Sequence, residues 1–271
     1  MGARREERFL FALRIRGVIN TTAAIPSQIR GVVVVGLVGF AAASWAYLGV
    51  VAARMDDMSS ALAMPMTSAW SPLQAALMVT MWVVMMAAMM VPSALPMLLT
   101  YDRLDRGSPQ GRAGSVTLFA AGYAVVWSGF AVAAAGVQWV LQTMALVDGM
   151  GEATQRGLAG LLLVGAGTFQ FSPVKRRSLG ACRTPMGFLT ASWRDGRSGA
   201  LRMGLHHGSL CLRCCWALMI LLFVLGVMNL FWVALLAIFV LAEKMATRGE
   251  VVSILGGVAM IIWGFGTLLG G

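Results

Sequence analysis

Long apolar segments separated by short polar gaps make up most of the chain. A helix rises about 1.5 Å per residue, so roughly 20 apolar residues cross a hydrocarbon core about 30 Å thick. Runs of that order cover residues 32–53, 74–99, 115–141, 157–172, 208–227, 230–246 and 251–270. The pattern predicts an all-α, polytopic transmembrane bundle of about seven spans. A count of six also fits, because the fourth run is short and only the Met228–Asn229 region separates the fifth from the sixth.

Composition supports a lipid environment for these runs. Hydrophobic residues form 59% of the 271 residues and charged residues only 12%, and the mean hydropathy is +0.79. A chain with this composition is expected to lie in a lipid bilayer rather than in water. The net charge of +10 does not indicate nucleic-acid binding, because nearly all Lys and Arg residues lie in the polar gaps, where they set membrane orientation.

The basic residues alternate from gap to gap. Six precede the first run, three follow the second and seven follow the fourth, whereas residues 54–73 and 142–156 contain one each. Because Lys and Arg accumulate on the cytoplasmic side, the N-terminus is expected on the inner side of the membrane. Residues 1–30 then form a basic cytoplasmic segment, and residues 31–271 form the transmembrane domain with an inner loop over 173–207. Glu243 and Lys244 are expected at the inner interface.

A cluster of cysteines and a histidine is the strongest chemical signal. His207, Cys211 and Cys214 share one helical face, because spacings of four and three residues return to nearly the same angle. Cys215 flanks them, and Cys182 in the preceding loop would complete the ligand set. Thiolate and imidazole suit Cu(I) or Zn(II), with copper favoured over zinc. The alternative is that these cysteines are small packing residues and that the paired histidines mark a helix boundary.

Methionines are concentrated in the second run and in the gap before it. Stripes at helical spacing include Met85, Met89 and Met90, whose soft thioethers would serve as auxiliary copper ligands. Methionine is also a flexible core filler, so for these stripes alone packing is slightly favoured over ligation. The preceding gap would act as a loading platform for a soft cation, because it combines methionines with two aspartates: Met55, Asp56, Asp57, Met58, Met64 and Met66.

Several motifs from Trp82 onward carry a family resemblance. They read Trp82-x-x-Met85-Met86-x-x-Met89-Met90-x-Pro92, Gln170-x-Ser172-Pro173-x-Lys175, Cys182-Arg183-x-Pro185, Cys211-x-x-Cys214-Cys215-Trp216-Ala217-Leu218-Met219 and Gly226-Val227-Met228-Asn229 followed by Glu243-Lys244. With these the chain resembles a bacterial family of predicted metal-binding integral membrane proteins of unknown function. The family pattern has a further cysteine three residues after the lysine, where this chain has Ser178. The resemblance implies metal binding in a membrane and supplies no reaction.

Three functional hypotheses follow from these signals. The leading one is a transition-metal-binding membrane protein that handles or moves copper and exchanges it with other membrane subunits or a metal chaperone. The second is a membrane metalloenzyme, or a subunit of one, that performs redox or oxygen chemistry on a lipophilic substrate. The third is an assembly or scaffold subunit without metal. The chain contains neither a Ser-His-Asp set nor a phosphate-binding loop, so hydrolysis and nucleotide chemistry have no support.

Overall fold

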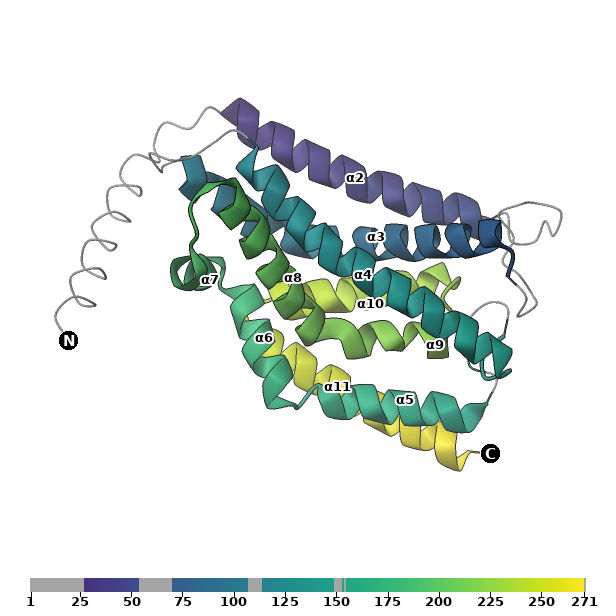
Figure 1. Cartoon of the computed structure of the whole chain (residues 1–271). Coiled ribbons are helices and arrows are strands. Elements are labelled where there is room, and N and C mark those ends of the chain that lie inside the picture. Colours follow the sequence, from purple (N-terminus) through teal and green to yellow (C-terminus); the bar gives the residue numbers. More distant parts are fainter. Residues whose placement is uncertain (1–26, 54–69, 107–113, 149–152, 154, 271) are drawn as a thin grey trace.

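A computed structural model describes residues 27–53, 70–106, 114–148, 153 and 155–270. The regular elements in these residues are helices, which confirms the all-α prediction (Figure 1). They are α2 (Ser27–Ala53), α3 (Pro72–Arg106), α4 (Ser115–Thr143), α5 (Arg156–Phe169), α6 (Pro173–Arg183), α7 (Pro185–Ser192), α8 (Gly196–Ile220), α9 (Leu222–Leu225), α10 (Leu230–Met245) and α11 (Gly249–Leu269). The predicted loading platform at residues 55–66 and most of the basic N-terminal segment lie outside the described residues.

Five of the described helices are long and apolar enough to cross a membrane. They are α2 from Val34, α3, α4, α8 continued by α9, and α11. The pair α5 and α6 makes a sixth if its 62° bend lies within one broken span. Helix α10 has 16 residues, which extend only about 24 Å at the usual rise per residue. The described residues therefore support five or six candidate spans rather than the expected seven.

The segment expected as an inner loop, 173–207, is mostly helical. It forms α6, α7 and the first part of α8. Pro173 and Pro185 stand in the first turns of α6 and α7, and the Ser172 hydroxyl accepts the Lys175 backbone N–H at 3.1 Å to cap α6. Helix α6 buries Lys175 and Leu179 and exposes the arginines between them. Because α6 contains many charged residues, its mean hydropathy is low and does not predict this amphipathic helix.

Glycines allow the backbones of α4 and α8 to approach closely. A Cβ on Gly204 of α8 would collide with the Phe119 carbonyl oxygen of α4, and one on Gly122 would collide with the Leu201 carbonyl oxygen. Small residues at helix contacts bring backbones together in this way in membrane bundles. The approach fixes α8, with its cysteines, against α4.

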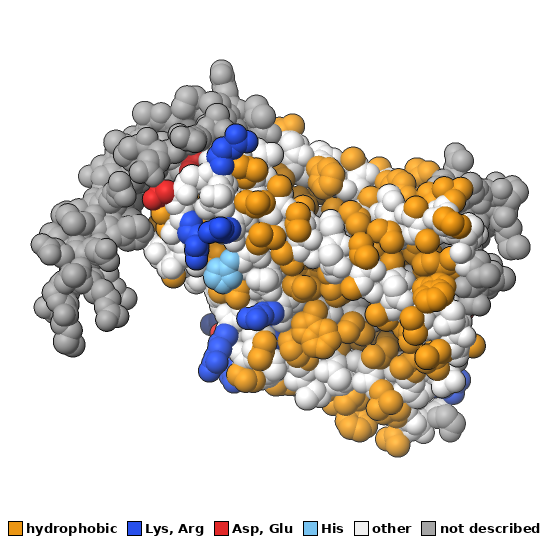
Figure 2. All heavy atoms as spheres, viewed as in Figure 1, with side chains coloured by type: hydrophobic (Ala, Val, Ile, Leu, Met, Phe, Trp, Pro, Cys, Tyr) orange, Lys and Arg blue, Asp and Glu red, His pale blue; other side chains and the backbone are white. Residues whose placement is uncertain are grey.

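The core is centred on α3, which packs against α2, α4 and α10. Its large buried side chains include Trp82 and Tyr101 together with the methionines Met78, Met81, Met85, Met86, Met89, Met90 and Met97. Figure 2 shows apolar side chains over the flank of the bundle, while most visible Lys and Arg side chains gather at the end where α8 begins. This separation of apolar flank and basic end matches what the positive-inside rule requires of one membrane face.

Candidate metal centre

The cysteine-bearing face of α8 is turned into the protein. His207, Cys211, Cys214 and Cys215 are all at most 3% exposed. Helix α8 packs against α4 and α6, and α6 also contacts α10. The residues that the sequence places on one helical face therefore lie in the interior of the protein.

The four cysteine side chains meet across two helices. Cys214 Sγ and Cys215 Sγ donate to the Cys211 carbonyl oxygen at 3.0 and 2.9 Å. Cys182, which α6 supplies, lies close enough to the side chains of Cys211 and Cys214 to interact with them. All four are free thiols, and Cys182 is the one that is only partly buried. The thiols thus extend from the interior toward the surface of α6.

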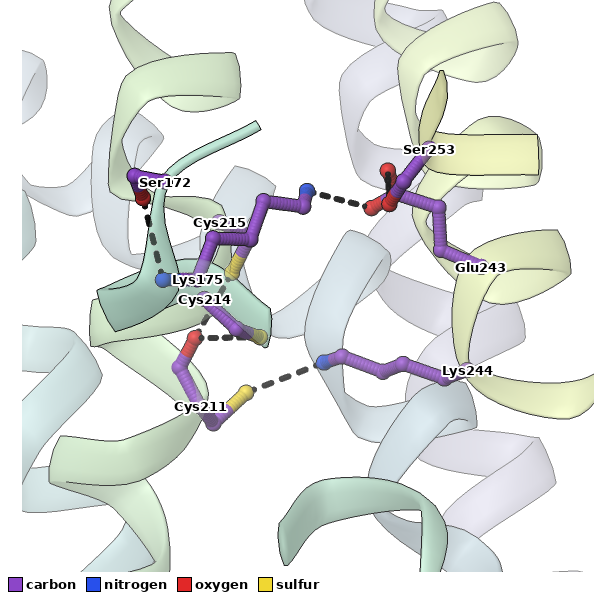
Figure 3. A network of polar contacts seen from close by, with 8 residues as sticks. All are labelled: Ser172, Lys175, Cys211, Cys214, Cys215, Glu243, Lys244 and Ser253. Carbon is purple, nitrogen blue, oxygen red and sulfur yellow. Dashed lines mark hydrogen bonds and ion pairs between the residues drawn. The ribbon is translucent and has the colours of Figure 1, made fainter. Parts of the chain in front are cut away.

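Polar groups from two other helices contact Cys211. Lys244 Nζ of α10 donates to Cys211 Sγ at 3.0 Å, and the Tyr123 hydroxyl of α4 lies 3.1 Å from the same sulfur (Figure 3 shows the lysine contact). Lys244 Nζ also donates to Ser93 Oγ of α3 at 2.9 Å. The Tyr123 hydroxyl donates to the Met90 carbonyl oxygen at 3.2 Å. Cys211 is therefore the best-connected thiol of the group.

A second charged contact lies beside the thiols. Lys175 Nζ of α6 forms an ion pair with Glu243 Oε2 at 2.8 Å, and both side chains are at most 2% exposed. Ser253 of α11 donates to the other carboxylate oxygen at 2.6 Å. Figure 3 shows Lys175 and Lys244 reaching α10 and the cysteine face from opposite sides. Glu243 and Lys244, which the sequence predicts at the inner interface, are buried within the protein, because α6, α8 and α11 cover the end of α10.

The charges in this network place a cation against one cysteine in particular. Glu243 is paired with Lys175, so the ammonium of Lys244 faces thiols rather than a carboxylate among the described residues. A buried ammonium needs a nearby negative charge, and a thiol ionises more readily than a phenol. The S–H groups of Cys214 and Cys215 are engaged as donors to a carbonyl oxygen. Cys211 is consequently the thiol that accepts a hydrogen bond from Lys244, and a cation in this place favours the thiolate form.

His207 offers a nitrogen without a partner. Its Nδ1 is buried and makes no hydrogen bond. The ring lies one helical turn before Cys211 and packs against Tyr123 and Phe188, with ring centroids 5.7 and 5.3 Å apart. An unpaired buried imidazole nitrogen is costly unless it binds something. This orphan atom and the sulfur donors beside it fit a soft metal ion.

The methionines of α3 line the core next to this network. Met85, Met89 and Met90 are each at most 1% exposed. Met90 is tied to the network by its backbone carbonyl, which accepts from the hydroxyls of Ser93 and Tyr123. The hydrogen bonds of the described residues join neither Met85 nor Met89 to a cysteine. Their burial is equally compatible with packing and with a route for Cu(I) along α3 that is lined by soft thioether groups.

The thiols are close together but not arranged around an ion. Within the described ranges, no group of three or more His, Cys, Asp or Glu side chains is placed to hold a metal. The reason is visible in the contacts, since Cys214 and Cys215 point to a carbonyl oxygen. Ser178 is buried one turn before Cys182 on α6, so a cysteine at that place would share the Cys182 face. Metal binding here requires the side chains of α8 to rotate.

Comparison with known proteins gives one match. The profile of a family described as "PpoB2: Copper chaperone" matches residues 79–267, which are 189 of the 271 residues. The matched part contains all four cysteines, His207, both buried lysines and Glu243. No curated protein and no solved structure matches the chain.

Proposed function

The chain belongs to the PpoB2 copper chaperone family, and on that premise we propose that it is a membrane protein that binds Cu(I) at its buried thiols and passes it to a partner. The observation that carries the proposal is the meeting of Cys182, Cys211 and Cys214 from α6 and α8. Thiolates are soft donors and select Cu(I) over hard ions. Copper is the cargo of such a protein rather than a resident cofactor.

Cys211 is the first ligand in this proposal. Lys244 at 3.0 Å stabilises its thiolate, so Cu(I) meets an ionised sulfur without waiting for a proton to leave. Cys214 and Cys182 lie beside Cys211, and one of them at a time joins it by turning its sulfur toward the ion, so that two thiolates hold Cu(I). Cys215 and His207 complete the possible donors on α8, and the unpaired Nδ1 of His207 is free to take part.

Cys182 is the ligand through which copper reaches a partner. It contacts the buried Cys211 and Cys214, yet it is only partly buried. A partner thiol or imidazole can approach Cys182 first and replace the α8 ligands one at a time. Stepwise exchange keeps Cu(I) bound to sulfur throughout, which avoids release of the free ion.

The membrane setting belongs to the same proposal. Five helices, or six with the bent pair, are long and apolar enough to cross a bilayer, and most of the visible basic side chains lie at one end of the bundle (Figure 2). We place that end on the cytoplasmic side of a bacterial inner membrane. Met85, Met89 and Met90 act as auxiliary soft donors along the buried face of α3.

Anaerobic Cu(I) titration of the purified, reduced protein in detergent tests the proposal. The affinity is measured by competition with a chromophoric Cu(I) chelator, and X-ray absorption identifies the ligand atoms. The wild type is expected to bind one Cu(I) with sulfur ligation, and Cys211→Ser/Cys214→Ser is expected to bind at least 100-fold more weakly. Ser209→Ala on the same helix is the matched control. Unchanged stoichiometry and affinity in the double variant would overturn the assignment.

The histidine is tested with a pair of neighbours. His207→Ala removes the buried ring with the unpaired nitrogen, whereas His206→Ala removes an exposed ring. Only His207→Ala is expected to weaken Cu(I) binding, by roughly tenfold if the nitrogen is a ligand. Equal affinities in the two variants exclude His207 from the ligand set and leave the thiols to bind copper.

A further inference from the structure

The ammonium of Lys244 lies beside the thiols of α8. Its Nζ is 3.0 Å from Cys211 Sγ and 2.9 Å from Ser93 Oγ. The hydroxyl of Ser93 in turn donates to the Met90 carbonyl oxygen. Because α3 anchors the ammonium through Ser93, its position does not depend on the cysteine alone. A positive charge is therefore fixed beside the proposed copper ligands.

The neighbouring charges do not neutralise this ammonium. Glu243 precedes Lys244 in the sequence, but its two oxygens are engaged by Lys175 and Ser253. The Lys175–Glu243 pair is neutral as a unit. Within the described residues, Lys244 Nζ contacts the Cys211 sulfur and the Ser93 hydroxyl and forms no ion pair with a carboxylate.

This fixed charge distinguishes metal ions by their valence. Cu(I) with two thiolates has a net charge of −1, so the complex together with Lys244 is neutral. Zn(II) with two thiolates is neutral by itself, and Lys244 then leaves a net charge of +1 in a buried site. Burial of an uncompensated charge is strongly unfavourable. The same two sulfurs therefore favour a monovalent ion when the ammonium is present.

We infer that Lys244 is a specificity-determining residue that makes the buried Cu(I) dithiolate electrically neutral and disfavours divalent ions. This inference rests on the proposed function, because it presumes copper at the thiols. It adds the reason why a copper-handling protein would keep a lysine inside an apolar helix. Lys244 Nζ keeps its hydrogen bond to the Cys211 sulfur when copper binds there.

Substitution of Lys244 separates its charge from its shape. Lys244→Met keeps the length and removes the charge, Lys244→Gln removes the charge and keeps a donor, and Lys244→Arg keeps the charge. Arg213→Met is the matched control, because Arg213 lies between Cys211 and Cys214 in sequence but is exposed on α8. Cu(I) and Zn(II) dissociation constants are measured for each purified variant by anaerobic chelator competition, with circular dichroism and gel filtration to confirm folding.

The expected readout is the ratio of the two affinities. Lys244→Met and Lys244→Gln should lower Cu(I) affinity at least tenfold and leave Zn(II) affinity equal or higher, so the Cu(I) preference falls by tenfold or more. Lys244→Arg and Arg213→Met should keep the wild-type ratio. If both neutral variants fold and retain that ratio, the inference is overturned while copper binding stands. If the wild type binds no Cu(I), the proposed function and the inference both fall.

Discussion

The buried ion pair between Lys175 and Glu243 gives the most direct test of how the α6 and α10 helices are held together. Lys175→Met leaves the Glu243 carboxylate in the interior without its cation, which lies at 2.8 Å in the wild type. At an effective dielectric constant of about 20, unit charges about 4 Å apart attract by roughly 4 kcal/mol. Removal of one partner of a buried pair typically costs about 3–5 kcal/mol. We expect a loss of that size in the free energy of unfolding.

Thermal unfolding in mild detergent measures this loss. A change of about 4 kcal/mol corresponds to an apparent melting temperature lower by on the order of 10 °C for a chain of this size. Arg176→Met is the matched control, because the side chain is next along α6 and exposed, and it should change stability by less than about 0.5 kcal/mol.

The double variant separates the loss of a pair from the loss of a side chain. Lys175→Met/Glu243→Met removes both charges together, and apolar replacement of a buried pair is often neutral. It should therefore recover most of the stability that Lys175→Met loses. A double variant no more stable than Lys175→Met would refute the argument that an unpaired buried charge causes the loss.

Three further substitutions have defined outcomes. Gly204→Ala should destabilise the protein by about 1–3 kcal/mol in thermal unfolding, because the new Cβ meets the Phe119 carbonyl oxygen. Trp82→Phe should cost about 1–3 kcal/mol, because Gln138 Oε1 loses its 2.7 Å bond from the indole while Gln138 Nε2 already has no partner. Cys182→Ser should retain Cu(I) at the α8 thiols yet slow its transfer to a chelator at least tenfold in stopped-flow measurements.

Each of these has a contrary result, and the glycine substitution also has a matched control. Gly136→Ala on α4 adds a Cβ with no neighbour within 4 Å, so an equal loss there would contradict the steric argument for Gly204. For Trp82, stability unchanged within about 0.5 kcal/mol would contradict the hydrogen-bond argument. For Cys182, transfer at the wild-type rate would show that copper leaves the buried thiols by another path.

The apolar pattern predicted the long helices well. The run 115–141 became α4 (Ser115–Thr143), and the run 74–99 became most of α3 (Pro72–Arg106). These helices follow from length and hydropathy, which are local properties of the chain. The segment 173–207 was expected to be a loop because its mean polarity is high, although its helices bury one face and expose the other. The proline and serine signals at the start of α6 were present in the sequence and could have identified that helix.

The cysteines were identifiable from spacing, whereas their electrostatic partners were not. A helical period is enough to place His207, Cys211 and Cys214 on one face. Lys244 and Tyr123 lie on other helices, 33 and 88 residues from Cys211 in sequence. A charged pair at the end of an apolar run is usually interfacial, so only the packing of α6 and α11 over α10 reveals that Glu243 and Lys244 are buried.

The sequence by itself determined the all-α class, the long apolar helices and the soft-donor chemistry of α8, because each depends on residues close together along the chain. Tertiary structure alone decided that Cys182 meets Cys211 and Cys214, and that Lys244 rather than Arg213 faces the thiols. Those outcomes depend on which helices pack side by side and at what depth. The close glycine contacts between α4 and α8, and the ion pair that joins α6 to α10, fix that arrangement through groups distant in sequence, which no local pattern encodes.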